Sequence, residues 1–117
     1  MVMYLLVNIL EQSEHLTGIL EGFAGIGIKG STVLNSTGMG RVLMQSHAGV
    51  GITEEIDTVV NSCEPTNRTL LTLIPDKDIL DKATDIIRSF CGDLSEPGKG
   101  VLFVLPIEYA EGLAKSS

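Results

Sequence analysis

The sequence contains few of the residues from which metal sites and disulfide frameworks are built. Among 117 residues there are two cysteines, two histidines, 4% aromatic residues and no tryptophan. Cys63 and Cys91 stand apart, and neither belongs to a CxxC pair or has a histidine neighbour. We therefore expect reduced thiols, with no disulfide and no metal site.

Positive charge is also scarce. Eight Lys and Arg residues stand against 15 Asp and Glu residues, which gives a formal net charge of −7. Proteins that hold DNA, RNA or an anionic bilayer by charge carry a positive surface. The balance therefore argues against a nucleic-acid partner, and an anionic small ligand would need a local group of cations.

A long apolar run is missing as well. The apolar start, Val2 to Leu10, is too short to cross a membrane, which takes about 20 residues. It has neither the basic flank nor the small-residue cleavage site of a signal peptide. We expect a buried first strand in a cytoplasmic protein that does not insert into a membrane.

The periodicity that is present predicts two βαβ units. One helical segment begins near Glu11 and ends at Gly25 or Gly27, and the other follows Asp76 as its N-cap and ends at Gly92. Their apolar stripes are Leu16, Ile19, Leu20 and Phe23 in the first, and Ile79, Leu80, Ala83, Ile86, Ile87 and Phe90 in the second. The expected strands are 2–9, 28–36, 69–74 and 101–105. This order is typical of an α+β, ferredoxin-like βαβ-βαβ sandwich, with a four-stranded antiparallel sheet and two helices on one face.

The packing of this sheet can also be anticipated. Gly18 and Gly22 lie four residues apart, and we expect them to let the first helix press onto the sheet. The strands 2–9 and 101–105 are apolar at alternate and intervening positions alike, so the second face of the sheet is apolar too. No element of the chain remains to cover that face, which favours a closed cyclic homo-oligomer.

Residues 37–68 form an unusually long connection between the two units. We expect residues 1–117 to form one domain, and a compact domain rarely carries such a connection unless the loop is functional or disordered. Glycine-rich stretches lie before it at 27–33, at its start at 38–41, and further along the chain at 97–100, before the last expected strand. Each places small residues and a cation where the backbone can approach an anionic ligand closely.

These stretches resemble the nitrogen-regulatory P-II signal transduction proteins, and most closely a divergent P-II-like branch. The residues that carry the likeness are Gly27-Ile28-Lys29-Gly30-Ser31-Thr32-Val33, Gly38-Met39-Gly40-Arg41 and Gly98-Lys99-Gly100 running on to Glu108. The resemblance implies a homotrimer that binds adenine nucleotides between subunits. It also implies that 37–68 is a T-loop-like segment that engages a target protein.

The same resemblance implies a ligand site. Thr32 is expected on the adenine side, and Gly38, Gly40 and Arg41 near the phosphates. Gly98, Lys99 and Gly100 are expected to form the facing loop of the neighbouring subunit. Glycines allow backbone N–H groups to converge on phosphate oxygens, and a guanidinium adds charge in a bidentate geometry.

The chain also departs from the nitrogen regulators. Val42 replaces the glutamine that helps to hold a metal and 2-oxoglutarate, and Val101 replaces a lysine, with Lys99 two places before it. Tyr109 and Gly112 stand where two arginines hold phosphate, and 37–68 contains no tyrosine. We therefore expect an effector bound without metal, weakly, through Arg41.

Two alternatives remain open. One is a structural or interaction trimer of the same fold without a ligand, and the other is a CutA-like metal-tolerance protein. His15 and His47 have no Cys, His or Asp at ligand spacing, and no Ser/His/Asp or Cys/His set can be assembled. We expect a protein that is not an enzyme and has no metal site.

Overall fold

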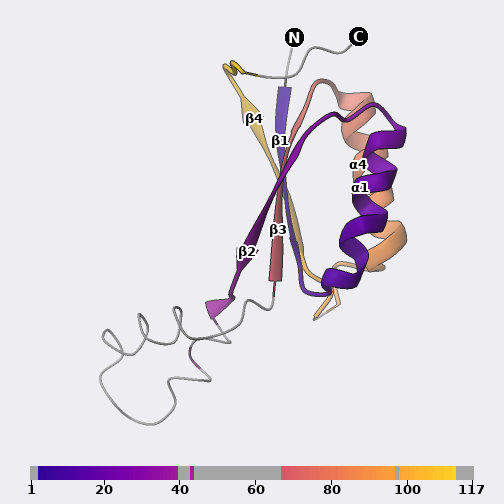
Figure 1. Ribbon diagram of the computed structural model, residues 1–117, viewed down its shortest axis with the longest axis vertical. Helices are drawn as coiled ribbons and strands as arrows, with labels where there is room; N and C mark the ends of the chain where they lie inside the picture. The colour runs from indigo at the N-terminus through magenta and orange to yellow at the C-terminus, as the bar shows by residue number, and fades with distance from the viewer. Residues whose placement is uncertain (1–2, 40–42, 44–66, 97, 113–117) are drawn as a thin grey trace.

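The computed structural model describes residues 3–39, 43, 67–96 and 98–112. The described residues form four strands and two helices, with a short 3₁₀ turn before the first helix (Figure 1). In chain order the elements are β1 (Met3–Leu10), η1 (Ser13–His15), α1 (Leu16–Gly25), β2 (Ser31–Ser36), β3 (Asn67–Ile74), α4 (Lys77–Cys91) and β4 (Val101–Ile107).

The strands form one antiparallel sheet in the order β2-β3-β1-β4. Leu6 in the central strand β1 lies opposite Thr72 of β3 and Val104 of β4. Both helices lie on one face of this sheet (Figure 1). The predicted fold class, an α+β ferredoxin-like sandwich, is therefore confirmed.

Some strand boundaries differ from the prediction. β2 begins at Ser31 instead of Ile28, because Ile28 is tied to the end of α1 by a hydrogen bond from its N–H to the carbonyl of Phe23 at 3.0 Å. β3 begins at Asn67, two residues earlier than expected. β4 runs on through Pro106, whose missing N–H is tolerated because β4 is an edge strand.

The ends of helix α4 follow its predicted caps. The Asp76 carboxylate accepts a hydrogen bond from the N–H of Ile79 at 2.9 Å. Gly92 has a φ of 79°, a value that glycine adopts at little cost, and its N–H donates to the carbonyl of Arg88 at 2.9 Å. Helix α1 has no side-chain cap and follows directly on η1.

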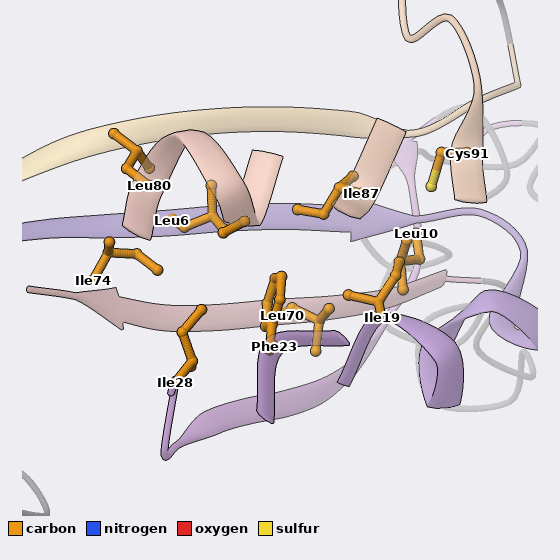
Figure 2. Close-up of a cluster of buried hydrophobic side chains, with 11 residues drawn as sticks. Leu6, Leu10, Ile19, Phe23, Ile28, Leu70, Ile74, Leu80, Ile87 and Cys91 are labelled. Atoms are coloured by element: carbon orange, nitrogen blue, oxygen red, sulfur yellow. The ribbon is translucent and has the colours of Figure 1, made fainter. Parts of the chain in front are cut away.

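The core lies between the helices and one face of the sheet (Figure 2). Its buried members are Leu6, Leu10, Ile19, Phe23, Ile28, Leu70, Ile74, Leu80, Ala83, Ile87 and Cys91. Both predicted stripes supply this cluster. Phe90 is the exception: it was expected within the second stripe, yet it is 40% exposed.

The small residues of α1 face the other helix. A Cβ at Gly18 would collide with the ring of Phe90, and a Cβ at Gly22 would lie 2.8 Å from Cγ2 of Ile86. The expectation that these glycines press α1 onto the sheet is therefore wrong. They let α1 and α4 approach each other, and Phe90 fills the notch above Gly18.

Candidate functional site

The sheet has a second face that no described helix or strand covers. Opposite residues of an antiparallel pair share a face, so Val7 lies with Leu71 and Phe103, and Leu5 with Leu73 and Leu105. We call this surface the open face; its members are Met3, Leu5, Val7, Ile9, Thr32, Leu34, Ser36, Asn67, Thr69, Leu71, Leu73, Val101, Phe103, Leu105 and Ile107. Phe103 and Leu105 are 44% and 45% exposed, so the predicted apolar second face is confirmed among the described residues.

Two predicted ligand loops lie at one end of the sheet. Gly38 follows the end of β2, and Gly98 to Gly100 precede β4. Because β2 runs parallel to β1 and β4 runs antiparallel to it, both loops lie at the end where β1 finishes at Leu10.

The same two loops lie at opposite edges. The order β2-β3-β1-β4 places three inter-strand spacings between them, roughly 14 Å at the usual strand separation. A single copy of the chain therefore holds the two glycine loops apart. Gly40 and Arg41, the other predicted members of the site, lie outside the described residues.

The fold itself explains part of the glycine pattern. Gly98 and Gly100 have φ values of 78° and 103°, and a Cβ on Gly100 would lie 2.5 Å from the carbonyl oxygen of Ile9. At Gly38 the nearest atom to such a Cβ is Nδ2 of Asn67, at an ordinary 3.6 Å, and φ is not positive. The fold thus requires glycine at position 100 but not at position 38.

The charge of Lys99 acts on the end of helix α4. Burial raises the pKa of the Cys91 thiol, and the nearby Lys99 ammonium partly offsets this by favouring the thiolate. Cys91 ends α4 and belongs to the core on the covered face of the sheet. The Lys99 ammonium thus lies close enough to affect Cys91, and its role as a phosphate ligand stays a prediction.

A cavity lies at the other end of the open face, where β1 begins. Its volume is about 380 Å³, and it is lined by Met3, Gly27, Ile28, Lys29, Gly30, Ser31, Thr32, Leu71, Leu73, Pro75 and Gly112. Thr32, predicted on the adenine side, is exposed and forms part of this wall. Lys29, the cation of the Gly27–Gly30 stretch, also lines the cavity, although it is not one of the predicted ligand residues.

Hydroxyl groups hold the edge strand β2 to β3 on both faces. On the covered face Ser31 Oγ and Thr72 Oγ1 lie 2.7 Å apart, and Thr72 is fully buried. On the open face the Thr69 hydroxyl donates to Ser36 Oγ at 2.9 Å. These contacts fix the strand that carries Thr32.

The described residues contain no group of three or more His, Cys, Asp and Glu side chains that could hold a metal ion. His15 shares a hydrogen bond with Gln12 through Nε2 at 3.0 Å, and its ring lies 6.0 Å from that of Phe90. The acidic surface of α4 is exposed and partly paired, as in the 3.0 Å contact between Lys77 and Asp81. Within the same described ranges, no helix combines the length and apolar character needed to cross a membrane.

Comparison with known proteins supports the architecture. The chain matches no protein-family model and no curated protein. Among solved structures it is similar to the GlnK–ATP complex of B. subtilis, with a TM-score of 0.57 over 91% of this chain and 82% of that one. The sequence identity is 16%, so the likeness is one of fold.

Proposed function

We propose that the protein is a ligand-sensing regulator of the P-II type. It forms a homotrimer, binds an anionic effector, an adenine nucleotide, between subunits, and engages a target protein through residues 37–68. The shared fold with GlnK, which is solved as an ATP complex, supports this proposal. The residue roles come from the glycine motifs and the geometry of the sheet.

The observation that carries the proposal is the separation of the two glycine loops. They lie at the same end of the sheet but at opposite edges. In a closed ring of identical copies, the β2 edge of one copy meets the β4 edge of the next. The Gly38 loop of one copy then faces the Gly98–Gly100 loop of its neighbour, and each junction forms one cleft.

The open face supplies a reason for the ring to form. Val101, Phe103 and Leu105 expose 44–49% of their surface on the edge strand β4 alone. Contiguous apolar surface of this kind marks an interaction site on a stable protein. Packing the open faces together around a central axis removes it from water.

The nucleotide then lies along β2. Its base packs near Thr32 and its phosphates reach towards Gly38 and Arg41. From position 32 to position 38 an extended chain spans about 20 Å, enough for an extended nucleotide. The backbone groups on the outer edge of β2 can hydrogen-bond to the ligand, because β2 pairs with β3 alone among the described strands.

The decisive test combines light scattering with calorimetry. We expect a trimer mass at micromolar concentration and weak binding of ATP, ADP or AMP that needs no metal. Arg41→Ala should lower nucleotide affinity about tenfold or more, the usual cost of one charged hydrogen bond, without changing the mass. Arg88→Ala is the matched control, because Arg88 is exposed on α4 and pairs with Asp85 at 3.3 Å.

Contrary outcomes are distinct. A monomer mass argues against the ring. A nucleotide that binds equally well to Arg41→Ala places the site elsewhere.

A second candidate is a trimer of the same fold that acts as an interaction module without a nucleotide. The apolar, 49% exposed side chain of Val101 favours it, since P-II proteins are expected to have a lysine there. This candidate predicts the same trimer mass and no heat or stabilisation with any nucleotide.

A further inference from the structure

A buried asparagine is bonded to the strand that follows the glycine loop 98–100. Asn8 is 1% exposed and lies on the covered face of β1, between the core residues Leu6 and Leu10. We infer that Asn8 is a positioning residue, which holds the beginning of β4 so that this loop keeps the shape that receives the phosphates of the ligand. The inference rests on the proposed function, because it takes the loop to be part of the nucleotide cleft.

Asn8 is costly for the stability of the core. The residues opposite it are Leu70 in β3 and Leu102 in β4, and both are apolar. The Oδ1 atom of Asn8 is buried and has no hydrogen-bond partner among the described residues. A buried polar atom without a partner destabilises the fold, whereas a leucine at this position would continue the apolar row of Leu6 and Leu10. Core packing alone therefore does not account for an asparagine here.

The side-chain amide of Asn8 bonds to a residue far along the chain. Its Nδ2 donates to the carbonyl of Val101 at 3.0 Å, across a sequence separation of 93 residues. Val101 is the first residue of β4 and directly follows Gly100. The register between β1 and β4 also ends at this point, with the pair of Ile9 and Val101. The bond therefore fixes the beginning of β4 where the glycine loop joins the sheet.

The next residue of β1 restrains the loop in a second way. The backbone of Gly100 lies so close to Ile9 that a Cβ on this glycine would be 2.5 Å from the Ile9 carbonyl oxygen. Gly98 and Gly100 both have positive φ, and glycine can adopt many other conformations. A loop of this composition keeps one shape only when contacts at its ends offset the entropy that it loses. Asn8 and Ile9 together supply such contacts at the β4 end.

A phosphate site made of backbone N–H groups depends on the relative positions of those groups. They bind an anion well when they converge on it, as in other anion-binding turns. Without the Asn8 bond, the loop should leave the binding conformation for part of the time. The apparent affinity for the nucleotide then falls with the fraction of molecules that remain competent to bind. We expect a loss of about fivefold, the usual value of one hydrogen bond.

The test compares two core variants of the full chain. Asn8→Leu replaces the amide with an apolar side chain, and Ile74→Val is the matched control. Ile74 is also fully buried, but it lies opposite Tyr4, at the far end of β1 from the loop. Hydrogen exchange follows the amides of residues 98–102, and calorimetry gives the ATP affinity. Asn8→Leu should speed exchange at 98–102 about fivefold relative to α1 and weaken ATP binding about fivefold, whereas Ile74→Val should do neither.

Asn8→Ala serves as a second variant, because it removes the same donor without the bulk of leucine. The inference is wrong if exchange at 98–102 is unchanged in both Asn8 variants, or if exchange becomes faster while ATP affinity stays the same. An equal loss of ATP affinity in Ile74→Val would also overturn it, since any loss of core packing would then disturb the site. If the wild-type protein binds no ATP, the proposed function fails, and the exchange data decide separately whether Asn8 holds the loop.

Discussion

The two faces of the sheet are built from similar side chains but have opposite surroundings. On the covered face, Leu6, Leu70 and Ile74 are at most 1% exposed, because α1 and α4 pack over them. On the open face, Phe103 and Leu105 are nearly half exposed. The covered face therefore accounts for folding, whereas the open face and its two ends carry the features that point to partners and ligands.

A matched pair of aromatic truncations gives the sharpest contrast. Phe23 is 1% exposed in the core and Phe103 is 44% exposed on the open face. Phe23→Ala should lower the free energy of unfolding by about 3–5 kcal/mol, the usual cost of a large core cavity. Phe103→Ala should instead weaken the oligomer, and its melting temperature should depend more steeply on protein concentration. If both variants lower the free energy of unfolding of a dilute sample equally, the two faces do not differ in their contribution to folding.

The two glycine loops can be compared in the same way. Gly100→Ala should cost about 1–3 kcal/mol from its positive φ alone, and more from the contact with the Ile9 carbonyl. Gly38→Ala should leave the stability nearly unchanged, because its neighbours leave room for a methyl group. Chemical denaturation measures both. If Gly38→Ala lowers the free energy of unfolding as much as Gly100→Ala does, the fold requires glycine at position 38 for a reason other than its backbone angle and its neighbours.

The two hydroxyl pairs between β2 and β3 test the faces with smaller changes. Thr72→Val removes a bond to Ser31 at a fully buried position and should cost about 1 kcal/mol. Thr69→Val removes the bond to Ser36 and should cost less, because Thr69 is only partly buried within the chain. Urea unfolding of both variants measures the two losses in the free energy of unfolding. A larger loss for Thr69→Val than for Thr72→Val would contradict the prediction.

The smallest expected effect concerns pH. The pKa of Cys91 is raised in the folded protein, chiefly by burial. The folded state therefore keeps this proton longer than the unfolded state, so the contribution is present at neutral pH and is lost as pH rises through the range of the thiol. As the pH rises above the ordinary pKa of a thiol, about 8.5, wild type should lose more stability than Cys91→Ala does. Parallel pH profiles would show that Cys91 makes no such contribution.

The sequence was informative wherever periodicity or a cap decided the structure. The stripe around Ile19 and Phe23, the N-cap Asp76 and the C-cap Gly92 are all where the pattern predicts them. A stripe and a cap depend only on residues that are near one another in the chain, so they can be predicted from a single sequence.

Other features depend on which elements become neighbours. Gly18 and Gly22 accommodate α4 and not the sheet, and this follows from how the helices are placed over the strands. The cavity beside Lys29 could not be anticipated either, because its walls come from segments far apart in the chain. The Gly27–Gly30 stretch was the single local sign of it.

The pairing of Ser36 with Asn67 has one more consequence. The chain leaves the sheet after Ser36 and re-enters it at the paired residue Asn67. The 30 residues between them therefore form a loop whose two ends are already held together by the sheet. The entropic cost of such a loop grows only by about 0.6 kcal/mol for each doubling of its length. This loop can therefore be shortened, extended or exchanged with little effect on the stability of the sheet. Relatives can diverge in its length, and it is a suitable site for an engineered insertion.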